Sequence, residues 1–348
     1  MYNINKIDLL SLSYGELEDI IKDKLGLESY RARQIYSWVY KIDSFEQMSN
    51  ISDKHKKLLG EHFYIKKLGI SEKLASSDGT VKYLFDLGDG NKIESVLMRY
   101  NHGNSVCVST QAGCRMGCAF CASGVHGLAR DLTPAEMLLQ VINIERDAGL
   151  RVDNIVLMGI GEPLDNFDNV LRFLEFANSG LGIGMRHISL STCGLVDKIN
   201  ELKLKKLPVT LSVSLHAPND ELRSELMPIN NKYKINELLR ACKGYAEYTK
   251  RRISFEYILI NDFNDSERDA RELASRIKNI LAHVNLIPVN SVYKQGEREF
   301  APPGRKKTEI FKRVLESCGV NATVRRRCGD DVGAACGQLR LNKLIIID

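Results

Sequence analysis

Three cysteines in one short stretch carry the clearest chemistry in this sequence. Cys114, Cys118 and Cys121 follow a C-x3-C-x2-C spacing, with the aromatic residue Phe120 directly before the last of them. Cysteine thiolates hold cubane iron–sulfur clusters, and three of them leave one iron of a four-iron cluster open to a substrate or cofactor. A zinc site with a fourth ligand elsewhere, or a set of buried structural thiols, would use the same residue type.

The composition is that of an ordinary soluble chain. The sequence has 348 residues, of which 44% are hydrophobic and 27% charged, enough for one large domain and a smaller one. No apolar run approaches the length of a membrane span, and the first residues lack the apolar core of a signal peptide. The nine cysteines do not follow the spacing of a secreted disulfide framework. We therefore expect a cytoplasmic protein with no membrane partner.

Basic residues are grouped along the chain. The net charge of +5 decides nothing by itself. Groups of Lys and Arg fit contact with RNA phosphates, although any single group is more often a solvated loop or helix end. The groups are Lys203, Lys205 and Lys206; residues 250–252; residues 305–307; and residues 325–327.

The first part of the chain, before the cysteine triad, is expected to form an accessory domain and a connector. Residues 1–65 are expected to form a small helical domain, since Leu17, Ile21 and Leu25 recur at helical spacing. Its basic residues suit contact with RNA. Residues 66–103 are expected to form a strand-rich connector, in which two strand-like runs flank a Gly-Asp-Gly-Asn turn. Those runs are Val81–Leu87 and Ile93–Tyr100.

From residue 104 onward, strand patterns alternate with helix patterns. Six such units imply a parallel sheet with right-handed crossovers, and they are too few for a closed eightfold barrel. We predict an α/β fold, an open partial (β/α)6 barrel over residues 104–340, followed by a tail at 341–348. The predicted strands are Ser105–Thr110, Asn154–Met158, His187–Ser191, Val209–Leu215, Ile253–Ile260 and Val284–Val289, with a last strand at Asn321–Arg326.

Several further motifs occur in a fixed order between about Glu94 and Leu339. They are Cys107-Val-Ser-Thr-Gln-Ala-Gly-Cys114, Met158-Gly-Ile-Gly-Glu-Pro163, Leu190-Ser-Thr-Cys-Gly194, Ser214-Leu-His-Ala-Pro218, Leu226-Met-Pro-Ile-Asn230, His283-Val-Asn-Leu-Ile-Pro-Val-Asn290 and Ala335-Cys-Gly-Gln-Leu339. With the cysteine triad, they make the sequence resemble the RlmN/Cfr family of radical S-adenosylmethionine RNA methyltransferases. The RlmN type modifies C2 of an adenosine in 23S rRNA and tRNA, and the Cfr type modifies C8 of the same rRNA base.

The resemblance implies a radical-SAM barrel with two cofactors. One is a 4Fe–4S cluster on Cys114, Cys118 and Cys121, and the other is S-adenosylmethionine, used twice per turnover as methyl donor and as radical source. The active site of such a barrel lies at the C-terminal ends of its strands. Glycines there let the backbone approach a ligand, and a carboxylate can accept a hydrogen bond from an ammonium group. The residues implied to bind S-adenosylmethionine are Gly161, Glu162, Ser191, Ser214, Leu215, His216 and Asn290.

The resemblance also implies three catalytic residues. Cys336 is the residue that is methylated and then carries the methylene to the RNA base. Cys107 attacks the cysteine–RNA adduct and releases the product through a transient disulfide with Cys336, and Glu94 is the general base. Without the resemblance, Cys107 and Cys336 would be interpreted as inert buried cysteines, and strand alternation would make Glu94 a solvent-facing residue.

The implied function is methylation of an adenosine C2 in 23S rRNA, and also in tRNA, by a monomer that takes electrons from a flavodoxin or ferredoxin. The run from Gly161 to Asp168 favours the C2 type over the C8 type, which confers antibiotic resistance on ribosomes. The loop at residues 122–127, Gly333 in place of an aspartate, and two additional thiols, Cys193 and Cys328, depart from the usual pattern. An alternative of another class is a non-catalytic, zinc-stabilised RNA-binding module.

Overall fold

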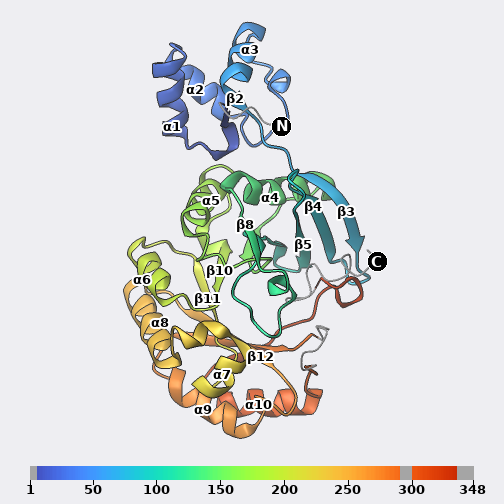
Figure 1. The fold of residues 1–348 in the computed structure, drawn as a ribbon, viewed down its shortest axis with the longest axis vertical. Coiled ribbons are helices and arrows are strands. Elements are labelled where there is room, and N and C mark those ends of the chain that lie inside the picture. Colours follow the sequence, from blue (N-terminus) through green and yellow to red (C-terminus); the bar gives the residue numbers. More distant parts are fainter. Residues whose placement is uncertain (1–5, 291–299, 335–348) are drawn as a thin grey trace.

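The computed structural model describes residues 6–290 and 300–334. A small N-terminal domain lies at one end of the molecule and packs against the larger body (Figure 1). Its helices pack around Leu17, Ile35 and Leu59, which are almost completely buried. Its elements are β1 (Ile7–Asp8), α1 (Tyr14–Asp19), a π-helical turn (Ile20–Lys24), α2 (Ser29–Tyr36), α3 (Asp53–His62) and β2 (Phe63–Tyr64), where β1 and β2 form a parallel pair.

A ten-stranded mixed sheet forms the body, in the order β14-β13-β12-β11-β10-β9-β6-β5-β4-β3. The strands from β14 to β6 are parallel, and β5, β4 and β3 continue the sheet in antiparallel fashion. The strands are β3 (Gly69–Ala75), β4 (Val81–Asp86), β5 (Lys92–Tyr100), β6 (Gly103–Cys107), β9 (Asn154–Leu157), β10 (Ile188–Thr192), β11 (Thr210–Ser214), β12 (Ile253–Leu259), β13 (Ala282–Pro288) and β14 (Ala322–Val324). A separate hairpin pairs β7 (Gln111–Gly113) with β8 (Leu128–Asp131).

Helices connect the parallel strands and lie along the outside of the curved sheet (Figure 1). The first of them starts with a capping box, in which the Thr133 hydroxyl and the Glu136 carboxylate accept each other's backbone N–H groups. Its apolar residues Met137, Val141 and Ile144 are fully buried. The helices are α4 (Pro134–Ala148), α5 (Phe167–Ser179), α6 (Val196–Leu204), α7 (Asp220–Leu226), α8 (Ile235–Thr249), α9 (Glu267–Ile277) and α10 (Arg305–Ser317).

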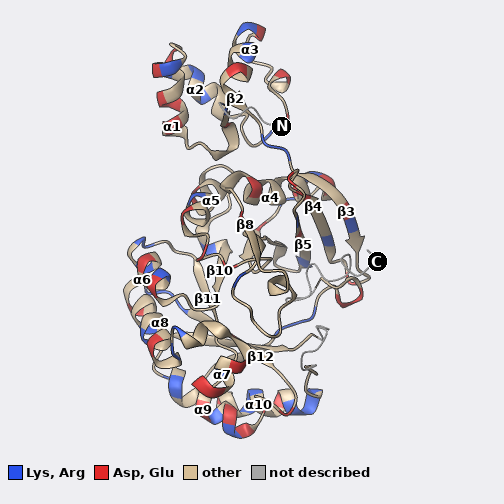
Figure 2. Cartoon of the chain, viewed as in Figure 1, with Lys and Arg blue, Asp and Glu red and all other residues tan. Residues whose placement is uncertain are grey.

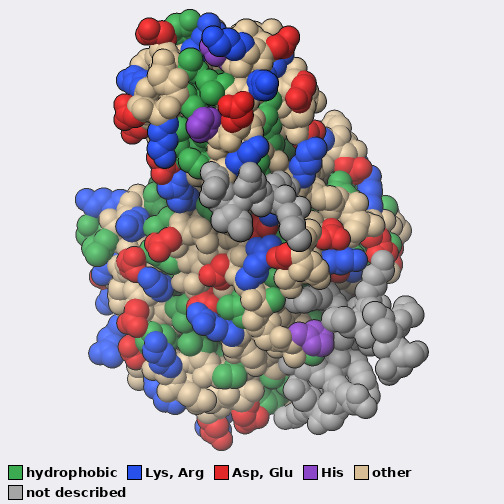
Figure 3. Space-filling view, turned by 45° about the horizontal axis from the view of Figure 1, so that its top comes forward, with side chains coloured by type: hydrophobic (Ala, Val, Ile, Leu, Met, Phe, Trp, Pro, Cys, Tyr) green, Lys and Arg blue, Asp and Glu red, His purple; other side chains and the backbone are tan. Residues whose placement is uncertain are grey.

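Ion pairs connect the N-terminal domain with the body. Arg172 on α5 lies 2.6 Å from the carboxylate of Glu16, and Arg146 on α4 lies 2.5 Å from that of Asp43. The hydrogen bond from Arg172 lowers the pKa of Glu16 to about 2. Partly exposed ion pairs of this kind contribute little to the free energy of unfolding. Their main effect is on the orientation of the N-terminal domain relative to the body. Both signs of charge alternate over this domain and over the outer helices (Figures 2 and 3).

The predicted partial barrel with an N-terminal accessory domain is confirmed. The last predicted strand joins the sheet as β14 and makes it seven parallel strands wide among the described residues. The sequence did not predict β3, because its residues are mostly exposed and polar. The expectation from alternation that Glu94 faces solvent is wrong: its exposure is 7%, because both faces of the middle of β5 are covered. The domain boundaries at 65 and 103 stay a prediction.

No helix within residues 6–290 and 300–334 has the length and apolar character needed to span a membrane.

Candidate active site

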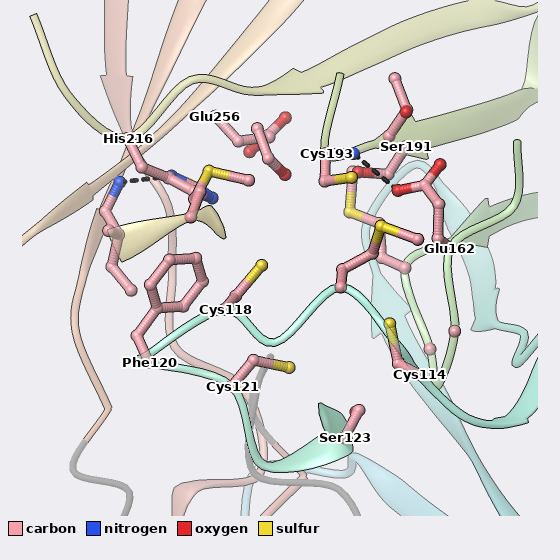
Figure 4. Close-up of a pocket in the computed structure, with 18 of the residues that line it drawn as sticks. Cys114, Cys118, Phe120, Cys121, Ser123, Glu162, Ser191, Cys193, His216 and Glu256 are labelled. Atoms are coloured by element: carbon pink, nitrogen blue, oxygen red, sulfur yellow. Dashed lines mark hydrogen bonds between the residues drawn. The ribbon is translucent and has the colours of Figure 1, made fainter. Parts of the chain in front are cut away.

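One cavity opens where the carboxyl ends of the parallel strands meet the cysteine loop (Figure 4). Its empty space measures about 930 Å³, with open solvent at its mouth included. The three triad cysteines line it. So do six of the seven residues implied to bind the cofactor: Gly161, Glu162, Ser191, Ser214, His216 and Asn290. Leu215 is the exception, since its side chain packs in the hydrophobic core while its backbone N–H donates to the Glu256 carbonyl.

The triad lies on the loop between β7 and β8, and backbone hydrogen bonds fix that loop at its base and in its middle. The Cys114 N–H donates to the Gly127 carbonyl at 2.9 Å. The Ala119 N–H donates to the Leu226 carbonyl, at the end of α7, at the same distance. Gly117 turns the chain between them with a φ of +67°, a conformation that disfavours other residues. The loop therefore holds the thiols toward the cavity (Figure 4).

The donor set of the triad fits a cluster better than a single metal ion. Burial raises the pKa of Cys114 to about 12 and raises that of Cys118 as well, so both thiols are protonated until a metal replaces the proton. A zinc ion needs its donors within about 2.0–2.3 Å of one point. In the described part of the chain, no three His, Cys, Asp or Glu side chains converge in that way. A cubane spreads its thiolates over separate irons.

The Gly-Glu pair after β9 forms one wall of the cavity. Gly161 has a φ of +108°, and a Cβ built there would lie 2.6 Å from the Gln111 side chain, so only glycine fits. The Glu162 carboxylate accepts the backbone N–H groups of Leu164 at 3.0 Å and of Cys193 at 2.7 Å. Burial raises the pKa of Glu162. The Glu162 carboxylate thus connects the ends of β9 and β10. The sequence did not predict that one carboxylate would bind the backbone at both strand ends.

His216 follows β11 in the left-handed region, with a φ of +59°. Its Nδ1 accepts the Ile258 N–H at 3.0 Å, and its ring meets that of Phe120 edge to face at 4.7 Å between centroids. Accepting a backbone N–H requires a neutral imidazole, and burial accordingly lowers the pKa of His216 to about 3. The side chain contacts the triad loop as an uncharged ring.

Two residues that sequence reasoning left without a role connect the strand ends. Cys193, directly after β10, lines the cavity as a fourth cysteine, although no fourth cysteine lies near the triad in the sequence. Arg223 on α7 is fully buried and donates to the carbonyls of Cys193 at 2.7 Å, Ser214 at 3.2 Å and Leu215 at 3.2 Å. Arg223 gave no signal, because its helix segment is rich in charge and indicates a solvent-exposed face.

Glu256 on β12 is a further residue that the sequence analysis passed over. Its Oε1 accepts hydrogen bonds from Ser254 at 3.1 Å and Asn285 at 3.0 Å. Its Oε2 is buried with no hydrogen-bond partner among the described residues and lies 4.0 Å from Arg325, and both side chains line the cavity. The sequence did contain a signal for Glu256, which is an acidic residue inside an otherwise apolar strand. A carboxylate buried in such a strand needs polar partners, so its position indicates a polar site.

Cys107 lies outside this cavity, in a neighbouring cluster. It is 6% exposed and packs with Val96, Met98, Cys328 and Ala334. A smaller cavity beside this cluster is lined by several of the same side chains, and it shares three lining residues with the larger cavity. The shared residues are Ile287, Asn290 and Arg325. The two regions are therefore adjacent.

Glu94 lies near the last described segment of the chain. Lys82 on β4 approaches the Glu94 carboxylate at 3.8 Å and donates to the Gly333 carbonyl at 3.3 Å. The turn before β4 holds the same segment, because Asp78 accepts the Gly329 N–H at 3.1 Å and Asp331 accepts the N–H of Ser77 at 3.0 Å.

This C-terminal segment packs against the connector strands and reaches the Cys107 cluster at Ala334. Cys336 lies outside the described residues.

Comparisons with known proteins agree with this geometry. The Radical SAM superfamily matches residues 108–274, and the ribosomal RNA large subunit methyltransferase N-terminal domain matches residues 7–65. A probable dual-specificity RNA methyltransferase RlmN of Desulforamulus reducens is 53% identical over 343 residues, 97% of each chain. A protein of the same description from Clostridium perfringens is 52% identical over 96% of each chain.

A solved structure extends the agreement to the whole fold. The crystal structure of a radical SAM methyltransferase from Sphaerobacter thermophilus superposes with a TM-score of 0.90 at 41% identity, covering 96% of this chain and 99% of that one. Family membership decides against the zinc-stabilised module without catalysis. The chain belongs to the RlmN family of radical S-adenosylmethionine RNA methyltransferases.

Proposed function

We propose that this protein methylates C2 of an adenosine in 23S rRNA, and in tRNA, through a methylated Cys336. The observation that carries the proposal is the adjacency of two regions: the cavity with the cysteine triad and the Cys107 cluster, which the chain reaches at Ala334, two residues before Cys336. The names of the relatives support RNA as the substrate. The run from Gly161 to Asp168 supports C2 over C8.

The chemistry of C2 explains why the family needs its cofactors. This carbon of adenine is electron-poor, so it does not attack a sulfonium methyl. When bound, the cluster and S-adenosylmethionine supply the methyl group and a carbon-centred radical. Cys114, Cys118 and Cys121 would hold the cluster through three thiolates, and the cavity walls would hold S-adenosylmethionine beside it.

The cofactor-binding roles follow the cavity wall. Gly161 lets the backbone approach the ligand, and Glu162, Ser191, Ser214 and Asn290 offer polar groups on the strand ends. Leu215 would contribute through its backbone, because its side chain is in the core. His216 would offer a neutral ring, since its Nδ1 is occupied by a backbone N–H.

The catalytic roles divide among three residues. The Cys336 thiol receives the methyl group. The carbon of this group then forms the bond to C2 of the adenine base. Glu94 takes the proton that C2 loses, and the electron released with it would return to the cluster that the triad holds. The buried position of Glu94 beside Lys82 supports this role. Cys107 then attacks Cys336 at sulfur, which breaks the sulfur–carbon bond and forms a Cys107–Cys336 disulfide. The freed methylene carbon takes up a proton to become the methyl group, and the methylated RNA leaves. A flavodoxin or ferredoxin would supply the electrons.

RNA would reach the site as a flipped or unstacked nucleotide, because a base in a helical stack cannot contact a cavity of this kind. The N-terminal domain and the basic groups would hold the surrounding phosphates. Within the basic group at residues 325–327, Arg325 is less suited to bind phosphates. It lines the cavity and donates a hydrogen bond to the Met158 sulfur at 3.4 Å. The protein would act as a monomer in the cytoplasm.

Nucleoside mass spectrometry tests the proposal. RNA from cells that lack the protein is digested and compared with RNA from the parent strain, with 2-methyladenosine and 8-methyladenosine as standards. Loss of 2-methyladenosine from purified 23S rRNA supports the proposal, and loss of it from purified tRNA supports the second substrate. Loss of 8-methyladenosine would overturn the C2 assignment, and an unchanged digest would overturn the function.

A further inference from the structure

The barrel holds a second, polar cavity on the side of the cofactor cavity that faces the N-terminal ends of the strands. Its empty space measures about 1190 Å³, with open solvent included. It shares three lining residues with the cofactor cavity and three with the smaller cavity beside the Cys107 cluster, and Arg325 lines all three cavities. The second cavity is therefore continuous with both parts of the reaction centre.

Short polar side chains line this second cavity on the inner face of the sheet. They are Ser189, Thr210, Ser212, Ser254, Asn285 and Thr323. Along the strands they alternate with residues of the hydrophobic core, such as Leu190, Leu211 and Phe255. Bulky branched side chains fill the interior of a closed α/β barrel. The short polar side chains leave a polar lumen here in place of such a packed interior, and this lumen is suited to a polar ligand.

Two aromatic rings lie at the end of this cavity near the N-terminal ends of the strands, which we call the lower mouth. Tyr100 is the last residue of β5, and His102 lies in the turn that leads to β6. Their rings stack with 5.1 Å between centroids and 10° between planes, and both line the cavity. Tyr100 packs against the Cys107 cluster, whereas His102 is exposed. Because nucleic acid bases stack on aromatic rings regardless of sequence, an unstacked base can extend this stack at His102.

Positive charge surrounds the same mouth. Arg186 lies just before β10 and Arg252 just before β12, and both are exposed side chains that line the cavity. With Arg325, three arginines line the cavity against one carboxylate, that of Glu256. Guanidinium groups bind phosphate oxygens through paired hydrogen bonds. The lower mouth therefore complements the two parts of a single-stranded nucleotide, its ring face and its phosphate.

The register of β5 and β6 places the lower mouth close to the reaction centre. Tyr100 pairs with Gly103, and Val96 pairs with Cys107. The two levels are four residues apart on β6, which is roughly 13 Å at about 3.3 Å per residue. A target base held beside Cys107 therefore leaves the next nucleotide of its strand near the mouth.

We propose that RNA enters the barrel from the N-terminal ends of its strands, where a nucleotide next to the target adenosine stacks on His102 and Arg186 and Arg252 bind the phosphates. The inference rests on the proposed function, because it takes the target to be an RNA nucleotide that reaches the Cys107 cluster. It adds the direction of entry, opposite to the triad loop, and a binding site for a neighbour of the target.

A fluorescent base tests the stacking at His102. The probe is a synthetic RNA stem–loop with the 23S rRNA target adenosine and 2-aminopurine, whose fluorescence is quenched by stacking, as its 5′ or its 3′ neighbour. The reconstituted wild type is compared with His102→Ala, His102→Phe and the control His126→Ala, which changes an exposed histidine on the triad loop. We expect quenching at one of the two neighbours in every protein except His102→Ala, because phenylalanine retains the ring face.

RNA affinity gives a second readout, measured with the unlabelled stem–loop. Loss of stacking for one base should weaken binding by His102→Ala by at least about fivefold, and His102→Phe should restore the affinity. Arg186→Gln combined with Arg252→Gln should flatten the slope of log K against log salt concentration by about 1.4, at about 0.7 for each phosphate contact. The control combines Arg240→Gln with Arg268→Gln, two exposed arginines on the outer helices α8 and α9, and should leave the slope unchanged.

The possible outcomes separate this proposal from the proposed function. Equal quenching, affinity and salt slope in the wild type and in the variants of the mouth would overturn the entry proposed here. In that case, loss of adenosine monophosphate binding in the same variants would assign the mouth to a free nucleotide. Weaker RNA binding by His126→Ala alone would place the entry at the triad loop and overturn the proposal as well. A wild-type protein that neither binds nor methylates the stem–loop would instead overturn the proposed function.

Discussion

His216 makes the stability of this protein depend on pH in a predictable way. Its imidazole is buried beside Phe120, and its Nδ1 is occupied by the Ile258 N–H. A proton on Nδ1 would break that hydrogen bond and place a charge in the interior. Burial therefore lowers the pKa of His216 to about 3, against 6.5 for a free imidazole.

The size of the effect follows from these two values. Between them the unfolded chain binds a proton that the folded protein does not bind, so the free energy of unfolding falls as the pH falls through this range. The contribution of His216 is intact above a pH of about 6.5 and is lost progressively toward 3. At a pH of about 5, the linkage relation gives a loss of about 2 kcal/mol relative to neutral pH.

The assay measures the free energy of urea unfolding at neutral pH and at a pH of about 5, for the wild type and for His216→Asn. Asparagine offers an oxygen in place of Nδ1, tolerates a φ of +59° and does not titrate. We expect the wild type to lose about 2 kcal/mol more than His216→Asn.

The exposed histidine of the loop after the triad provides the control, and His126→Asn should lose as much stability as the wild type. Equal losses in wild type and His216→Asn would refute the neutral buried imidazole.

Four further outcomes can be measured. Cys118→Ala should contain no four-iron cluster after reconstitution, and full iron content would remove it from the ligand set. Cys107→Ala should accumulate Cys336 covalently bonded to RNA, seen as a gel band that shifts on RNase treatment, and normal turnover would exclude Cys107 from product release. Neutralising about six residues of the basic groups should flatten the salt dependence of RNA binding by a slope of about five, and an unchanged slope would place the phosphate contacts elsewhere. Glu256→Gln should weaken binding of S-adenosylmethionine, measured by equilibrium dialysis, by about tenfold, because Oε2 accepts no hydrogen bond from the described residues and can accept one from the ligand. Unchanged affinity would exclude this contact with the ligand.

The sequence predicted the parts of the site whose residue types are rare and regularly spaced. The spacing of the triad indicated a metal or cluster site, and the resemblance to the family favoured the cluster. The same resemblance implied the cofactor-binding residues, and their positions at strand ends supported it, because parallel strands end at one edge of a sheet. The strands themselves were predictable because their apolar runs are bounded by turn residues, as in β12 and β13.

The sequence could not predict which charged residues are buried. Arg223 and Glu94 lie in segments whose local pattern indicates exposure, and their burial results from elements far away in the chain. Arg223 is covered because its side chain reaches the backbone just after β10 and β11, and its hydrogen-bond partners are 7 to 30 residues away. Glu94 lies beside Lys82, which also contacts the Gly333 carbonyl, 251 positions further along the chain. Such burial depends on tertiary contacts, which periodicity does not contain.

The turn at residues 76–80 contacts the segment at 329–334, beside the Cys107 cluster. This contact makes the local stability of the Cys107 cluster differ from that of the triad cavity. A part-buried hydrogen bond to Asp78, an exposed one to Asp331 and the Lys82 bond to Gly333 hold this contact, whereas the triad cavity is built on the ends of core strands. Regions held by exposed hydrogen bonds open at a lower free energy than the core. The Cys107 side can therefore be uncovered while the triad loop stays folded, so that amide hydrogen exchange at Gly329 reports a local opening rather than global unfolding.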